Sequence, residues 1–148
     1  RRTGRRPPGA DPAYVARIVP IIQDRLRRLD EFEDLFGFFF AEKLHYDPAL
    51  LLRKGFTAAQ TVVSLRQVLD RLAALIDWNG AAIVAALDSL VTALGVKRGD
   101  LFMMVRVAVT GKTETPPLDQ TMEALGRERC LRRLQQAIEA LEQREASA

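Results

Sequence analysis

Two adjacent apolar stripes constrain the fold of this chain more than any other feature of its sequence. The first runs over residues 62–76 and the second over residues 83–94, and in both of them valine, leucine and isoleucine recur at intervals of three and four residues. This period puts the apolar side chains on one face of an α-helix. Because only a short polar segment separates the stripes, the two helices are predicted to pack as an antiparallel hairpin.

Signals for helix ends agree with this interpretation. Thr57 and Gln60 have the spacing of a capping box, in which each side chain accepts a hydrogen bond from a backbone N–H at the helix start. Gly95 follows the second stripe, where a glycine can adopt the left-handed conformation that ends many helices. Asp11 followed by Pro12 has the pattern of an N-cap and a first helical residue, and it predicts an earlier helix.

The apolar segment over residues 101–109 is harder to assign. Its residues are apolar almost throughout, and the β-branched ones at its end would also suit a buried strand. Since the rest of the chain offers no convincing strand to pair with it, we predict a buried helix over residues 100–110 that Gly111 ends. Residues 110–117 are then predicted to form an exposed loop before a helix that starts at Pro117.

These assignments predict an all-α fold. A chain of 148 residues can bury a hydrophobic core without disulfide bonds, as one domain or as two small packed subdomains. An additional helix, capped by Asp30, is predicted across the aromatic sequence FEDLFGFFF, and a last helix follows Gly126. We therefore expect a helical bundle.

The side chains that catalysis usually needs are scarce. His45 is the only histidine and Cys130 the only cysteine, which excludes multi-histidine metal sites, CxxC sites and internal disulfides. Cys130 lies among arginines that could lower its pKa, although a buried structural cysteine is the interpretation we favour. No apolar run approaches the roughly 20 residues of a membrane span. We expect a cytoplasmic chain with no catalytic residue, metal or cofactor of its own.

The positive charge of the chain is unevenly distributed. Four of its 22 basic residues are arginines within the first ten positions, RRTGRRPPGA, so the remainder is close to neutral. We interpret residues 1–10 as a flexible basic tail or linker from a longer protein. The bulk charge is therefore weak support for nucleic-acid binding, which must be argued from local clusters such as the mildly basic residues 97–133.

One long segment carries a family resemblance. Residues 94–138, LGVKRGDLFMMVRVAVTGKTETPPLDQTMEALGRERCLRRLQQAI, resemble the C-terminal end of bacterial-type glutamyl-tRNA synthetases, which carries an LG-[LV]-K-x-G-x-LF-x-x-[LV]-R-x-A-[LV]-TG block, a proline loop and an LGKER-like helix. Residues 14–40 resemble, more loosely, the preceding anticodon-binding subdomain of the same enzymes. The catalytic domain, with its HxGH-type and KMSKS-type motifs, is missing from the sequence.

The resemblance implies an all-helical anticodon-binding portion of the helical cage type. Residues 11–46 would form the first anticodon-binding subdomain and residues 47–148 the C-terminal one. The segment containing Arg106 is helical in the family, in agreement with the helix predicted above.

The resemblance also implies which residues read the anticodon loop. Arg106 matches the family's anticodon-binding arginine, and Thr115, Pro116 and Leu118 match a loop that holds the first anticodon base through main-chain and apolar contacts. Arg25 matches an arginine that reads the last base, although nearby Arg27 and Arg28 leave that alignment soft. Single-stranded loop bases are read on their edges, which suits both an arginine and a rigid backbone.

Each of these assignments has a plainer alternative. Arg106 could instead form an internal ion pair with Asp100 or Glu114, and the proline loop could be an ordinary turn between helices. A second group of basic residues could contact phosphates or simply form a solvated charged face. That group comprises Lys112, Arg127, Arg129, Arg132 and Arg133.

Two functions follow from these readings. The first is an anticodon-binding module, monomeric and without a membrane, that binds glutamate tRNA, with glutamine tRNA as a further candidate. A catalytic domain in the same polypeptide would then use ATP, glutamate and magnesium. The alternative is a stand-alone helical protein-interaction module that docks a partner through Phe36, Phe38, Phe39 and Phe40.

Overall fold

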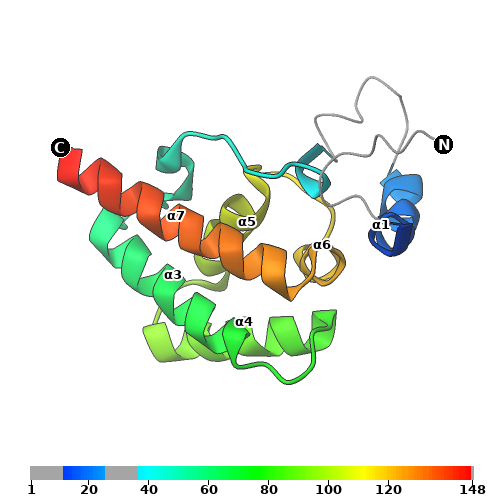
Figure 1. Ribbon diagram of the computed structural model, residues 1–148. Helices are drawn as coiled ribbons and strands as arrows, with labels where there is room; N and C mark the ends of the chain where they lie inside the picture. The colour runs from blue at the N-terminus through cyan, green and yellow to red at the C-terminus, as the bar shows by residue number, and fades with distance from the viewer. Residues whose placement is uncertain (1–11, 26–36, 148) are drawn as a thin grey trace.

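The computed structural model describes residues 12–25 and 37–147, and all regular secondary structure in this part of the chain is helical (Figure 1). Its six α-helices and two 3₁₀ helices confirm the predicted all-α class. In chain order the elements are α1 (Pro12–Arg25), η2 (Gly37–Phe39), η3 (Pro48–Leu51), α3 (Ala58–Ala73), α4 (Gly80–Leu94), α5 (Arg98–Thr110), α6 (Leu118–Leu125) and α7 (Arg127–Ser147).

The predicted hairpin is present as α3 and α4, which run in opposite directions and contact each other (Figure 1). The capping box is formed as expected. The backbone N–H of Gln60 donates to Thr57 Oγ1 at 3.1 Å, and the backbone N–H of Thr57 donates to Gln60 Oε1 at 2.9 Å. Asn79 caps α4, and Gly95 ends it with a left-handed φ of 66°. Local side-chain chemistry therefore sets the ends of both helices.

The long helix α7 crosses the front of the molecule and packs along α3 (Figure 1). Both helices contribute a fully buried apolar stripe, and this interface forms a large part of the hydrophobic core. The stripe of α3 comprises Leu65, Val68 and Leu72, and that of α7 comprises Leu134, Ile138 and Leu141.

Helix α5 is the buried centre of the bundle, as predicted for residues 100–110. It contacts α3, α4, α6, α7 and η3. Its buried residues are not confined to one stripe, which explains why hydrophobic periodicity could not distinguish helix from strand here. Gly111 ends the helix with a φ of 73°, and its N–H donates to the Val107 carbonyl at 2.7 Å.

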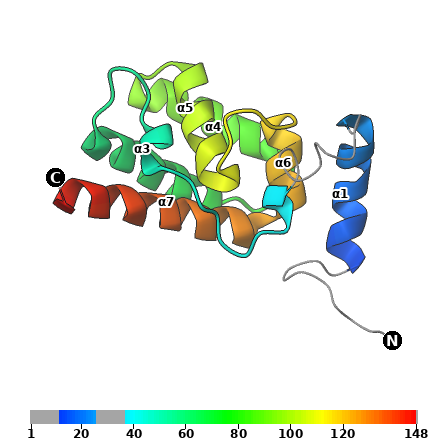
Figure 2. The same cartoon turned by 90° about the horizontal axis from the view of Figure 1, so that it is seen from above.

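Helix α1 lies at one end of the molecule, beside α6 (Figure 2). Tyr14 and Ile18 are buried there, and Arg17 Nε donates to the Ala124 carbonyl of α6 at 3.0 Å. The Tyr14 hydroxyl donates to the Phe39 carbonyl, and burial raises the pKa of this hydroxyl to about 12. The first helix is thus held to the bundle by polar as well as apolar contacts.

The aromatic segment is only partly described, since residues 30–36 lie outside the described chain. Its remaining part is not the predicted α-helix but a single 3₁₀ turn over Gly37–Phe39. Phe38 and Phe39 are buried, and the half-buried Phe40 packs edge-on against Tyr14 with ring centroids 6.2 Å apart. These side chains belong to the core and do not form an exposed docking patch.

Arg133 of α7 corrects one prediction, because it is 2% exposed and points into the bundle. Its Nη1 donates to the Val109 carbonyl at 2.7 Å, and its Nη2 donates to the carbonyls of Phe38 and Ala41 at 2.8 and 2.9 Å. Burial lowers the pKa of the guanidinium. With these donors committed to internal carbonyls, Arg133 is not a phosphate contact.

The first prediction concerns this buried arginine. Arg133→Met should lower the free energy of unfolding by about 3 kcal/mol, because it leaves three backbone carbonyls without a charged donor. Arg132→Met, one residue earlier and exposed, should change it by no more than about 0.5 kcal/mol. Urea unfolding of the three proteins measures both values. Equal losses in the two variants would contradict the structural role of Arg133.

The second prediction compares two glycines at helix ends. An alanine at Gly95 has no atom within 4 Å of its Cβ, whereas at Gly111 the Cβ would lie 3.2 Å from Tyr46 Cδ1. Gly95→Ala should therefore cost about 1 kcal/mol for the left-handed backbone alone. Gly111→Ala should cost about 1 kcal/mol more through crowding of the half-buried Tyr46 ring. Thermal unfolding tests this, and identical losses would show that the Tyr46 contact is unimportant.

Candidate nucleic-acid interface

Arg106 and Thr115, both predicted site residues, lie together in the structure. Arg106 is a half-buried residue of α5, and its Nε donates to Thr115 Oγ1 at 3.0 Å. Burial lowers the pKa of Arg106 from its ordinary value, which is so high that the side chain stays charged at neutral pH. The hydrogen bond orients the guanidinium through a neutral partner.

The alternative ion pairs of Arg106 are not found among the residues that the structure describes. Asp100 is paired with Arg53, with Oδ1 3.2 Å from Nε. No ion pair joins Arg106 to Glu114 in this part of the chain, and Glu114 is exposed. The positive charge of Arg106 is therefore oriented but not neutralised by the described residues.

Threonine hydroxyls fix the loop that follows α5. Thr115 Oγ1 donates to the Pro116 carbonyl at 2.7 Å, and Thr121 Oγ1 from α6 donates to the same carbonyl at 3.2 Å. At the loop's start, Thr110 Oγ1 donates to the Arg106 carbonyl at 2.6 Å and accepts from the Lys112 N–H at 3.0 Å. Both ends of the loop are thereby attached to helices.

The loop exposes less apolar surface than the sequence predicted. Pro116 is buried and Leu118 is 5% exposed, so both side chains pack against the core. Thr113, Glu114 and Pro117 are the exposed residues of the segment. The accessible surface of this loop therefore consists of main-chain groups and of the Thr113, Glu114 and Pro117 side chains, rather than those of Pro116 and Leu118.

Arg25 is the last residue of α1, and only its backbone is described. Arg27 and Arg28, the neighbouring candidates, lie outside the described residues. The assignment of Arg25 to the last anticodon base stays a prediction.

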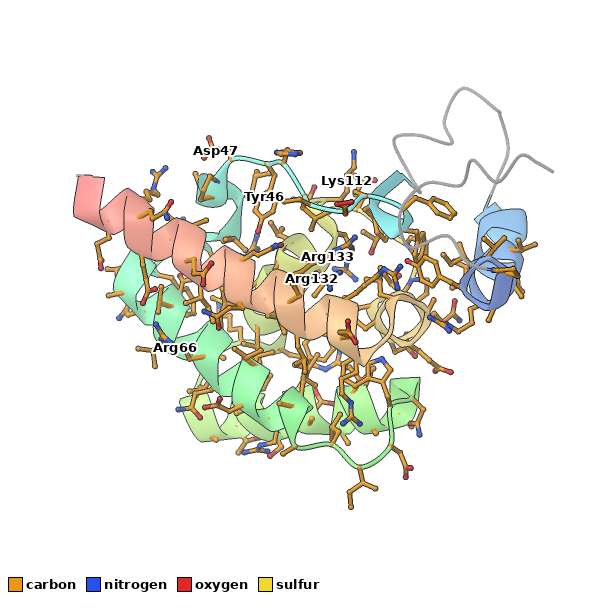
Figure 3. All side chains as sticks on the ribbon, in the orientation of Figure 1. Tyr46, Asp47, Arg66, Lys112, Arg132 and Arg133 are labelled. Atoms are coloured by element: carbon orange, nitrogen blue, oxygen red, sulfur yellow. The ribbon has the colours of Figure 1, made fainter. Side chains whose placement is uncertain are left out.

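The remaining predicted phosphate contacts occupy two places. Lys112 is half-buried at the start of the loop, whereas Arg132 is exposed on α7 (Figure 3). Arg127 Nη2 donates to the Ile76 carbonyl at 3.3 Å. The Arg129 guanidinium lies over the Tyr14 ring, 3.9 Å from its centroid.

Two functional candidates were not identified from the sequence. Arg17 reaches the same region as Arg129, and its position three residues after the buried Tyr14 places both on one face of α1. Thr121 anchors the loop carbonyl from α6. The sequence indicates the role of Thr121 less clearly, because a threonine in a short amphipathic helix does not show by itself to which carbonyl its hydroxyl donates.

The described residues contain neither a metal-binding cluster nor an exposed thiol. No group of three or more His, Cys, Asp or Glu among them could hold a metal ion. Cys130 is fully buried, its thiol is 3.7 Å from the Met122 carbonyl, and burial raises its pKa to about 12. This agrees with a structural cysteine. None of the described helices is long and apolar enough to cross a membrane.

Comparisons with known proteins agree with this geometry. A sequence model of the family described as "Anticodon binding domain" matches residues 5–138. The glutamate–tRNA ligases of Roseiflexus sp. and Roseiflexus castenholzii are 46% and 44% identical over 136 residues, which is 91% of this chain and 27% of each ligase. The ligase of Chloroflexus aurantiacus is 43% identical over 133 residues, 88% of this chain and 26% of the ligase.

A solved structure shows the same fold. The crystal structure of a glutamate tRNA ligase from Elizabethkingia meningosepticum, in complex with its amino acid, superposes with a TM-score of 0.73 at 22% identity. The match covers 88% of this chain and 26% of that one, so the chain spans about a quarter of the ligases it resembles. The expected resemblance to glutamyl-tRNA synthetases is confirmed, and this chain belongs to the anticodon binding domain family.

Proposed function

We propose that this chain is the tRNA-binding module of a glutamate–tRNA ligase. It binds the anticodon loop of glutamate tRNA and positions that tRNA for aminoacylation by a catalytic domain of the same polypeptide. The observation that carries the proposal is the hydrogen bond between Arg106 and Thr115. It joins the two segments that the family resemblance independently assigns to the anticodon, and it holds a charged guanidinium beside a fixed loop.

The arrangement can recognise an RNA base without chemistry of its own. The guanidinium of Arg106 offers several N–H donors in a planar fork, which suits base-edge acceptors or a phosphate. The main chain near Pro116 is held by two hydroxyls, so little backbone freedom is lost on binding. Thr115 and Pro116 therefore contribute a rigid surface, while Leu118 keeps that surface attached to the core.

Several finer points belong to the same proposal. ATP, glutamate and magnesium would be used by the catalytic domain, and this module would act as a cytoplasmic monomer. Arg25 would read the last anticodon base, and that contact would decide whether glutamine tRNA is also accepted. Lys112 would contact the phosphate backbone near the loop.

The alternative function, a protein-interaction module, loses its basis. Phe38 and Phe39 are buried and Phe40 packs against Tyr14, while Phe36 lies outside the described residues. The described aromatic residues stabilise the fold and offer no patch for a partner.

The third prediction tests the role of Arg106. Arg106→Gln should weaken binding of the glutamate anticodon stem-loop about tenfold, because a base-edge contact of an arginine contributes about 1–3 kcal/mol. Arg98→Gln is the matched control: Arg98 lies on the same helix at the opposite end, paired with Asp88 at 2.7 Å, and should leave binding unchanged.

Fluorescence anisotropy with stem-loops that differ at one anticodon base measures both affinity and discrimination. The wild-type chain should prefer the matched loop, and Arg106→Gln should lose part of that preference. Equal affinity of the wild-type chain for matched and scrambled loops would exclude the proposed function.

The fourth prediction concerns the orientation of Arg106. Thr115→Val removes the hydroxyl that accepts the hydrogen bond from Arg106 Nε–H, with little change in side-chain volume. It should weaken stem-loop binding about fivefold. Thr115→Ser keeps the hydroxyl and should stay within about twofold of the wild-type affinity. The same anisotropy titration distinguishes them, and circular dichroism checks that both variants are folded. Identical affinities for the valine and serine variants would show that the hydrogen bond is irrelevant to binding.

A further inference from the structure

A cavity of about 410 Å³ lies where α1, α6 and α7 meet, and neither Arg106 nor Thr115 lines it. Four arginines line it: Arg17 from α1 and Arg127, Arg129 and Arg132 from the first turns of α7. The rest of the lining is the Leu125–Gly126 segment and Glu128. Three of these arginines are already grouped from the sequence as possible phosphate contacts, and the fold adds a fourth, Arg17, from a distant helix.

Fixed contacts hold these guanidinium groups. Arg17 Nε donates to the Ala124 carbonyl at 3.0 Å, and the Arg17 guanidinium lies 5.1 Å from the Tyr14 ring centroid. Arg129 stacks on the same ring at 3.9 Å. Arg127 donates to the Ile76 carbonyl at 3.3 Å and lies 5.7 Å from the Trp78 ring centroid. Ring and carbonyl contacts orient an arginine without removing its charge.

Among the described residues that line the cavity, arginines outnumber carboxylates. Glu128 is the one carboxylate among the lining residues that the structure describes, its side chain is 94% exposed, and its Oε1 is 3.8 Å from Arg132 Nη1. An exposed pair of this kind contributes little attraction. Several guanidinium groups facing one space repel each other, and an anion with several oxygens relieves that repulsion through charge-assisted hydrogen bonds. Phosphate has the geometry and charge that such forks bind best.

Helix α6 connects this cavity to the loop over residues 110–117. The helix starts at Leu118, directly after the loop, and ends at Leu125, which lines the cavity. Eight helical residues extend about 12 Å, which is the axial rise of three to four nucleotides in one RNA strand. One stem-loop can therefore reach both places.

We propose that this arginine cavity binds a backbone phosphate of the tRNA anticodon stem-loop, in addition to the base contacts at Arg106; the proposal rests on the proposed function. The cavity supplies affinity that does not depend on the RNA sequence, whereas Arg106 and the loop that follows α5 discriminate between anticodon bases. Arg17 is a phosphate-binding residue in this arrangement. The phosphate contact spans two segments far apart in the chain, so it also holds α1 against α6 and α7 in the complex.

The test uses two arginines of the same helix. Arg132 and Arg144 have side chains 46% and 48% exposed, and each lies 3.8 Å from one carboxylate, but only Arg132 lines the cavity. The affinity of wild type, Arg132→Gln and Arg144→Gln is measured for matched and scrambled stem-loops over a range of salt concentrations. Circular dichroism confirms that both variants are folded.

Arg132→Gln should weaken binding of both RNAs by the same factor, about threefold to tenfold, and should lower the slope of log affinity against log salt by about 0.7–0.9. Arg144→Gln should match the wild type. If Arg132→Gln behaves like Arg144→Gln while the wild type still discriminates, the phosphate cavity is wrong and the proposed function stands. If the wild type does not discriminate but Arg132→Gln still lowers the slope, the cavity stands and the anticodon function is wrong. No binding to either RNA overturns both.

Discussion

The buried guanidinium of Arg133 is the contact on which the arrangement of this module depends. It joins α7 to the last turn of α5 through Val109 and to the 37–41 connection through Phe38 and Ala41. These carbonyls lie close to segment ends, where regular helical hydrogen bonding stops. One side chain thus satisfies backbone acceptors that a purely apolar core would leave unpaired. Because Val109 precedes Gly111 by two residues, the same contact fixes the start of the loop over residues 110–117.

Hydrogen bonds at both ends of the loop over residues 110–117 hold it against the part of the bundle that Arg133 fixes. Thr110 fixes its start, while Thr115 and Thr121 meet at the Pro116 carbonyl near its end. Threonine suits this role because its hydroxyl can donate and accept while its branched Cβ restricts rotation. Gly111 allows the chain to leave α5 directly beside Tyr46, a close approach that a Cβ would obstruct. Hydrogen bonding and packing therefore restrict the same segment.

Much of the fold follows from local sequence signals, and the failures have identifiable causes. The capping box of α3 and the glycine ends of α4 and α5 depend on neighbouring residues alone, so their prediction was reliable. The sequence predicts Arg133 at the surface, because arginine side chains are mostly exposed in proteins. Its place between the buried Cys130 and Ala137, at helical spacing, was the available signal for the core.

Only part of the candidate site could be predicted from the sequence, for a related reason. The resemblance placed Arg106 and Thr115, and the structure supplied their mutual hydrogen bond. The grouping of Arg17 with arginines more than a hundred residues away has no local signal, since it arises from the packing of α1 on α6. Long-range proximity of like charges is also what sequence reasoning expects least, because such charges repel unless an anion lies between them.

The arginines of the described surface differ in the kind of group that holds them. Arg66, Arg98 and Arg144 are paired with carboxylates, and Arg132 of the cavity also lies 3.8 Å from the exposed Glu128 carboxylate. Arg106, Arg17 and Arg127 are instead oriented by a hydroxyl or by backbone carbonyls. A carboxylate would orient these side chains too, but it would cancel the charge that attracts a polyanion and would repel each incoming phosphate. Neutral acceptors orient an arginine without cancelling its charge. An arginine that neutral groups hold in place is therefore a more informative sign of an RNA-binding surface than the net charge of the chain.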